Sequence, residues 1–145
     1  MSSSTDKSYA VTAEINIPAN DTYRFMSEPF NLGKWAFGCW NTETTNEDGL
    51  YCGTSLFDKE KMFFKIKCFP EILLIDFLVG EREALKARIS ARIIPADVYE
   101  APDDRCLLTL TAWRGHTMTE SRWKQLCMCH ETEILLLKNL IEASD

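Results

Sequence analysis

One histidine near the C-terminal end, His130, has the residue type and the position for proton transfer. At 100° per residue it falls on one line with the apolar side chains of a helical stretch, namely Trp123, Cys127, Ile134, Leu137 and Ile141. An imidazole with an ordinary pKa near ~6.5 acts as a general acid or base at neutral pH. A neutral histidine satisfied by one hydrogen bond in the core would give the same pattern, so both interpretations fit.

Two charged residues, Asp76 and Arg114, are candidates for work beside such a histidine. Asp76 is the single acid in the apolar stretch 72–79, and strand alternation does not decide which face it occupies. A carboxylate buried there would have to be paired or protonated. Arg114 ends the last predicted strand and could orient a ligand through its carboxylate or phenolate group. Arg88 and Arg92 could do the same, but we expect both to face solvent.

The aromatic residues are the candidates for a binding surface. Trp35 and Trp40 could cover a flat ligand, or they could anchor short helices onto a sheet. Cys127 could be a reactive thiol or a small apolar filler. If the chain binds a ligand, we expect these side chains to form the walls of the site: Trp35, Trp40, Phe64, Trp113, Trp123 and Cys127.

Nothing in the sequence indicates a metal or a cofactor. Cys127, Cys129, His130 and His116 are close in sequence, but Cys129 lies about 100° from His130 and about 160° from Cys127 around the helix. This set lacks the C-x-x-C spacing of a closed zinc site. The six glycines form no phosphate-binding or dinucleotide-binding motif, and no nucleophile elbow is present.

Composition limits the class of protein. The chain has 145 residues, 46% of them hydrophobic, and a net charge of −6, which argues against nucleic acid and anionic membranes as partners. No apolar run reaches the ~18 residues of a membrane span. We expect a disordered serine-rich segment over 1–8 and a single domain over 9–145. The six cysteines, without an export signal, suggest reduced thiols and a cytoplasmic protein.

Hydrophobic periodicity predicts the elements that would position these side chains. Alternation predicts a strand over 9–17, and Pro18 and Pro29 bracket a short helix over about 20–27, followed by a turn over 31–35. Six further strands are expected over 40–45, 50–57, 62–69, 71–79, 87–94 and 105–114. The last element is a long helix over 117–145, capped by Thr117 and Glu120. Meander strands with one long helix predict an α+β fold in which the helix covers a curved antiparallel sheet.

This order of elements resembles the helix-grip superfamily of START, birch-pollen-allergen and polyketide-cyclase-like proteins. The cues are Ile17-Pro-Ala-Asn20, Pro29-Phe-Asn-Leu-Gly-Lys-Trp35, Trp113-Arg114, and a C-terminal helix that includes His130-Glu-Thr-Glu. The resemblance implies a seven-stranded curved sheet, two short helices and a long C-terminal helix that together enclose an apolar cavity.

The resemblance also implies a range of functions. The leading expectation is a polyketide cyclase/aromatase-like protein that holds a hydrophobic aromatic or polyketide-type molecule and catalyses enolisation, cyclisation or dehydration. His130 would transfer the proton, and Asp76 or Arg114 would orient the substrate. The alternatives are a carrier or sensor for a lipid, quinone or similar ligand, and an interaction domain of the chaperone-cofactor kind. Fold alone does not choose among them.

Overall fold

Seven strands and three α-helices make up the fold in the computed structural model, which describes residues 6–144. Residues 1–5 and 145 lie outside it, so the expected disorder of the N-terminus stays a prediction. The strands are β1 (Ser8–Ile15), β2 (Trp40–Thr44), β3 (Tyr51–Thr54), β4 (Lys61–Phe69), β5 (Leu74–Gly80), β6 (Lys86–Pro95) and β7 (Cys106–Trp113). The helices are α1 (Ala19–Ser27), α2 (Pro29–Leu32) and α3 (Glu120–Ala143), with 3-10 turns at Pro70–Ile72 and Ala96–Tyr99.

The strands form one antiparallel sheet in the order β1-β7-β6-β5-β4-β3-β2. Each strand pairs with its chain neighbour except β1, which closes the far edge against β7. Alternation places one set of side chains inward: on β7, Cys106, Leu108, Leu110 and Ala112 are fully buried, whereas Leu107, Thr109 and Thr111 are only half-buried. One face of the sheet is therefore the floor of the core.

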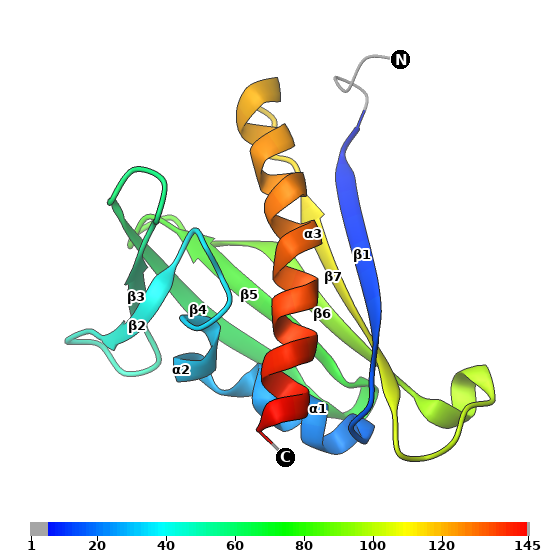
Figure 1. The fold of residues 1–145 in the computed structure, drawn as a ribbon. Coiled ribbons are helices and arrows are strands. Elements are labelled where there is room, and N and C mark those ends of the chain that lie inside the picture. The colour runs from blue at the N-terminus through cyan, green and yellow to red at the C-terminus, as the bar shows by residue number, and fades with distance from the viewer. Residues whose placement is uncertain (1–5, 145) are drawn as a thin grey trace.

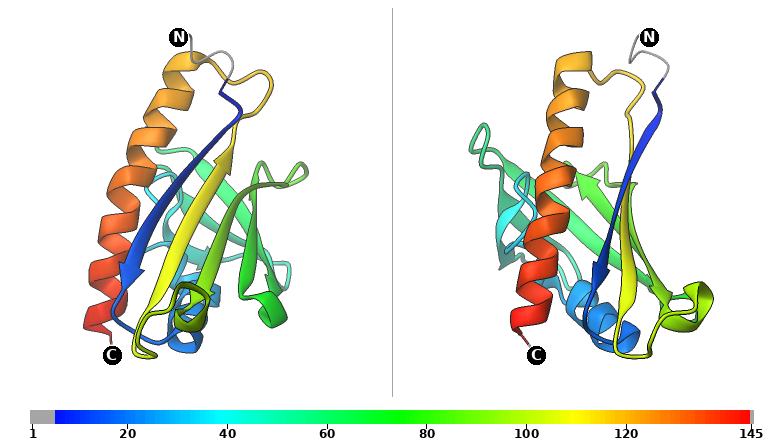
Figure 2. Two further views of the ribbon diagram at one scale, coloured as in Figure 1. Left: turned by 90° about the vertical axis from the view of Figure 1, so that its right-hand side faces the viewer. Right: turned by 45° about the vertical axis from the view of Figure 1, so that its right-hand side comes forward.

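Helix α3 runs along the concave face of this curved sheet (Figures 1 and 2). It packs chiefly against β1, while α1 and α2 lie at the end of the molecule near the C-terminus (Figure 1). The predicted helix-grip α+β architecture is confirmed. Pro29 ends the first short helix, as expected, and also occupies the first turn of α2, where its missing N–H costs nothing.

The C-terminal half of α3 is anchored to the sheet. Ile134, Leu137 and Ile141 are buried in the main core, and the polar flank is tied to β1. Lys138 Nζ donates to Glu14 O (2.6 Å), and the Asn16 N–H donates to Glu142 Oε2 (2.8 Å). This half of the helix therefore closes one end of the concave face.

Three sequence-based boundaries were wrong. The long helix begins at Glu120, not at 117, because Thr119 is its N-cap: the Thr119 hydroxyl accepts a hydrogen bond from the Arg122 N–H (3.2 Å). The strand expected over 71–79 begins only at Leu74, since Pro70–Ile72 forms a 3-10 turn that ends with Leu73 at a left-handed φ of 53°. The strand expected over 50–57 shortens to Tyr51–Thr54.

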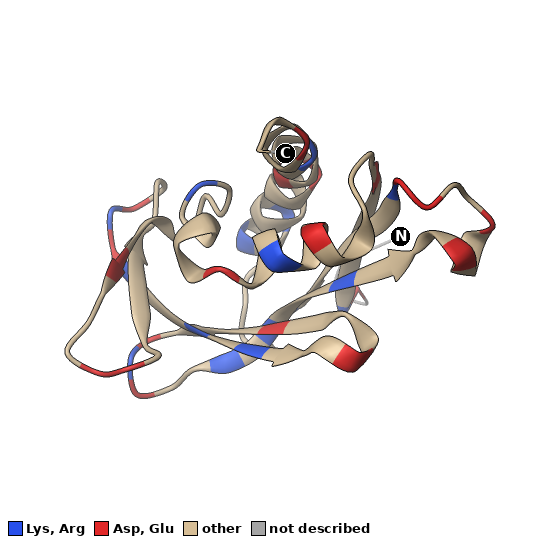
Figure 3. Ribbon diagram, turned by 90° about the horizontal axis from the view of Figure 1, so that it is seen from below, with Lys and Arg blue, Asp and Glu red and all other residues tan. Residues whose placement is uncertain are grey.

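The surface carries both signs of charge. Viewed from below, basic and acidic residues are interspersed on the strands and loops (Figure 3). Within residues 6–144, no helix is both long and apolar enough to span a bilayer.

Candidate functional site

A cavity of about 190 Å³ lies between the N-terminal half of α3 and the sheet. Apolar side chains from several elements form most of its wall, including Leu32, Trp35, Met62, Phe77, Val79, Ile89, Met118 and Leu126. The ring of Trp35 meets Phe77 edge-on, with centroids 5.9 Å apart. The anchored half of α3 lies beyond this space, so the cavity occupies the end of the concave face that the core leaves unfilled.

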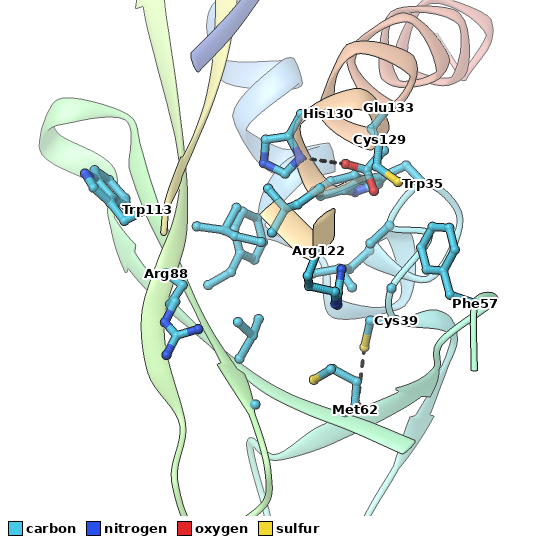
Figure 4. Close-up of a pocket in the computed structure, with 18 of the residues that line it drawn as sticks. Trp35, Cys39, Phe57, Met62, Arg88, Trp113, Arg122, Cys129, His130 and Glu133 are labelled. Carbon is cyan, nitrogen blue, oxygen red and sulfur yellow. Dashed lines mark hydrogen bonds and ion pairs between the residues drawn. The ribbon is translucent and has the colours of Figure 1, made fainter. Parts of the chain in front are cut away.

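A buried polar pair, His130 and Glu133, interrupts the apolar wall (Figure 4). His130 Nδ1 lies 2.9 Å from Glu133 Oε1, and the two side chains are only 3% and 6% exposed. Residues three apart on a helix lie on the same face, so α3 itself brings the two together. The Phe37 N–H, from the loop before β2, donates to Glu133 Oε2 (3.0 Å).

These contacts assign the imidazole tautomer. Glu133 Oε2 accepts a hydrogen bond from the Phe37 N–H. We take Glu133 as an ionised carboxylate, which can only accept, so its Oε1 is the acceptor in the contact with His130 Nδ1. We therefore place the His130 proton on Nδ1, which leaves a lone pair on Nε2. Carboxylate and imidazole together form an oriented base.

The other ring nitrogen, His130 Nε2, has no hydrogen-bond partner. Among the described residues, it is the one buried side-chain nitrogen or oxygen without one. Leaving such an atom unsatisfied costs about 1–3 kcal/mol. Because His130 lines the cavity, a bound molecule could supply the missing partner.

Two arginines add positive charge to the same lining: Arg88 from β6 and Arg122 from α3. Arg88 reaches the cavity because β6 bulges. Between the pairs Phe77–Ile89 and Val79–Lys86, two β6 residues stand opposite the single β5 residue Leu78. The bulge breaks the alternation, so that Arg88 and its neighbour Ile89 both line the cavity.

The thiols near the cavity are poor nucleophiles. Burial raises the pKa of Cys39 to about 12. Burial also raises the pKa of Cys129, which lines the cavity, and of Cys127. These thiols are protonated at neutral pH, which disfavours covalent catalysis through sulfur.

Of the nine residues expected at the site, three line this cavity: His130, Trp35 and Trp113. Trp113 remains 43% exposed and alternates with buried Ala112, so it belongs to the rim. Of these three residues, His130 and Trp35 belong to the wall of the cavity and Trp113 to its rim.

The other six lie elsewhere. Trp123 and Phe64 are buried away from the cavity, with Phe64 stacked on Tyr51. Trp40 packs against Phe37. Asp76 lies between buried Ile75 and Phe77 and so faces the opposite side of the sheet. Arg114 donates to Met118 O (3.2 Å), and Cys127 is half-buried beside the charges of Asp6, Glu131 and Arg114.

Sequence reasoning missed Glu133 and Arg122, and expected Arg88 to face solvent. Glu133 could have been found from its i,i+3 spacing to His130, which places both side chains on one face of the helix. Nothing in the strand pattern revealed the bulge that turns Arg88 inward.

Comparison with known proteins identifies the fold. The sequence matches no protein-family model and no curated protein. A START superfamily protein from Mycobacterium smegmatis matches in structure with a TM-score of 0.68, at 11% identity, over 96% of this chain and 99% of that one. The chain has the START-like, helix-grip fold.

Two aromatase/cyclase structures share the fold. The Zhui aromatase/cyclase from Streptomyces sp. R1128 matches with a TM-score of 0.67 at 12% identity, over 94% of this chain and 93% of that one. The di-domain aromatase/cyclase BexL, from the BE-7585A biosynthetic pathway, matches with a TM-score of 0.68 at 16% identity, over 94% of this chain and 46% of that one. Identities this low establish a common fold and nothing finer.

Proposed function

We propose that this protein binds a small, flat, apolar molecule carrying a hydroxyl group in the cavity beneath the N-terminal half of α3. The observation that carries the proposal is the buried Nε2 of His130, which has no partner among the described residues, in a mainly apolar wall. A ligand hydroxyl would donate to Nε2, while its rings would contact Trp35 and Phe77. Burying rings in such a space is favourable because it removes apolar surface from water.

The size of the cavity limits the ligand. An apolar cavity of ~150 Å³ accepts benzene, whereas drug-sized ligands occupy roughly 300–1,000 Å³. At about 190 Å³, this cavity suits one or two fused rings. A longer polyketide-type chain would have to extend out through the opening.

The His130–Glu133 pair also supports general-base chemistry on an enolisable ketone. Nε2 would take a proton from the carbon beside the carbonyl, the C–H electron pair would form the new C=C bond, and the oxygen would become an enolate. The Glu133 carboxylate would stabilise the imidazolium that forms. Enolisation opens the route to aldol closure or dehydration, the chemistry we favour given the aromatase/cyclases of the same fold. Asp76 and Arg114 have no part in this proposal.

Binding of 2-naphthol, an enol analogue of bicyclic size, tests the site. We expect the ligand to quench tryptophan fluorescence, and His130→Phe, which keeps a ring but removes the acceptor, to weaken binding about tenfold. His116→Gln is the matched control because His116 is exposed in the loop before α3. Equal affinity of His130→Phe and the wild type would remove His130 from the site.

Turnover is tested with 2-tetralone, whose enol resembles 2-naphthol. Deuterium incorporation at its C1 position, followed by NMR in deuterated water, should be faster with the wild type than with His130→Phe. Tight binding of 2-naphthol without any exchange of 2-tetralone would instead identify a carrier.

A further inference from the structure

We infer that the natural ligand of this cavity carries an anionic group, such as a carboxylate, in addition to its hydroxyl, and that Arg88 and Arg122 bind it. This inference rests on the proposed function and narrows its substrate class to small aromatic acids. The ligand would have two polar ends, with the hydroxyl at His130 and the carboxylate at the arginines.

The charge balance of the lining supports an anionic ligand. The protein has a net charge of −6, yet the charged residues that line the cavity are two arginines and one glutamate. Glu133 is already engaged by His130 and by the Phe37 N–H. The cavity of an acidic protein thus carries positive charge that its own glutamate does not neutralise.

Arg88 has no hydrogen-bond or ion-pair partner among residues 6–144. Its side chain is half-buried. Its planar group lies against the backbone of Gly115, where a Cβ would come within 2.8–3.0 Å of Nη1, Cζ and Nη2. The absence of a side chain at Gly115 therefore makes room for the guanidinium beside the cavity.

Arg122 is exposed and only weakly engaged. Its Nη1 donates to Gln125 Oε1 (3.2 Å), and it contributes to lowering the pKa of Asp58, although the hydrogen bond from the Glu60 N–H is the largest cause. In Figure 4, Arg122 lies between Arg88 and Phe57, away from the His130–Glu133 pair. Guanidinium groups bind carboxylates through paired N–H donors, and in a partly desolvated site such contacts are stronger than in water.

The test compares two probes that share a ring system and a hydroxyl: 2-naphthol and 6-hydroxy-2-naphthoate. The readout is the ratio of their dissociation constants at pH 7, measured by calorimetry for each variant. We expect the wild type to prefer the naphthoate by about tenfold. The double variant Arg88→Met/Arg122→Met should lose this preference.

Two further variants separate the position of the charge from its presence. Gly115→Ala should reduce the preference, because the new methyl group displaces Arg88 without removing its charge. Arg92→Met, on the same strand with an exposed side chain that bonds Ile72 O, should keep the wild-type ratio.

The two proposals fail in different ways. Equal affinity of the wild type for both probes, with binding still weakened by His130→Phe, would overturn the anionic ligand and leave the proposed function standing. A preference that survives in the double variant would also overturn it. No measurable 2-naphthol binding would overturn the proposed function itself.

Discussion

At the scale of single residues, the contact between His130 and Glu133 decides what the cavity offers to a ligand. The carboxylate accepts a hydrogen bond from Nδ1–H, so Nε2, the ring nitrogen left without a partner among the described residues, is an acceptor. The site should therefore select molecules that donate a hydrogen bond over molecules that only accept one. A site built around a buried polar group discriminates in this way because the wrong ligand leaves that group unpaired.

Glu133→Gln should reverse this selectivity. The glutamine can accept from the Phe37 N–H with its oxygen and donate to Nδ1 with its amide, which moves the histidine proton to Nε2. We expect 2-naphthol to bind roughly tenfold more weakly and 2-acetonaphthone, an acceptor of similar shape, to bind more tightly. Nitrogen-15 chemical shifts of the imidazole would report the tautomer directly.

A neighbouring glutamate provides the control for this change. Glu131 is exposed and bonds the hydroxyl of Tyr9 on β1, so Glu131→Gln removes the same charge two residues away without touching His130. It should leave the ligand preference unaltered. Unchanged imidazole shifts in Glu133→Gln would argue against the assigned tautomer.

At the scale of elements, the start of α3 depends on its cap. The Thr119 hydroxyl satisfies the N–H of Arg122, one of the first N–H groups that a helix leaves unbonded. The first turn of this helix also carries Arg122 into the cavity lining. Fraying at this end would therefore disturb the site before the core.

Thr119→Ala should lower the free energy of unfolding by about 1 kcal/mol, measured by urea denaturation at pH 7. Thr117→Ala is the informative control, since the sequence pattern placed the cap there and the structure does not. An equal decrease in the free energy of unfolding for Thr117→Ala and Thr119→Ala would instead support a helix that begins at residue 117.

Periodic patterns explain which elements were predictable. Of the predicted stripe, Trp123, His130, Ile134, Leu137 and Ile141 are buried, because one face of a long helix must cover the sheet. The sixth member, Cys127, is only half-buried. The bulge opposite Leu78 was not predictable, because apolar and polar residues alternate without interruption in the sequence of β6 up to Ile93 while the register of the strand pair shifts. The position of Arg88, one of the two arginines in the cavity lining, depends on that bulge.

At the scale of the whole molecule, the C-terminal half of α3 contributes to the main core, and its N-terminal half lines the cavity. Leu137 is fully buried in the core, whereas Leu126 is half-buried and lines the cavity. Truncating Leu137 creates a void in packed surroundings, whereas truncating Leu126 enlarges a cavity that already exists.

Leu137→Ala should therefore cost about 2–5 kcal/mol of unfolding free energy and leave the affinity for 2-naphthol unchanged. Leu126→Ala should cost only roughly 1 kcal/mol and change that affinity. Urea denaturation and fluorescence titration of both variants would check the division. Similar stability losses in the two would mean that the cavity end is as tightly packed as the anchored end.

The fold could be predicted from the sequence, but the residues that line the cavity could be predicted only in part. His130 and Trp35 were predicted to lie at the cavity because a histidine on an apolar helical stripe and a cluster of aromatic residues can be recognised in the sequence. We also expected Trp40, Phe64 and Trp123 at the site because they are aromatic, but these side chains pack outside the cavity lining. Which aromatic faces the cavity depends on how the sheet curves, and no single strand encodes that curvature.

The anchored half of α3 has a consequence for evolutionary divergence. Ile134, Leu137 and Ile141 hold the helix to the sheet and do not themselves line the cavity, so lining residues on the N-terminal half of α3 can change while this anchor is kept. Ligand specificity can then change during evolution while the stability of the fold is retained. A common fold shared with chains only 11–12% identical is what such a separation would allow.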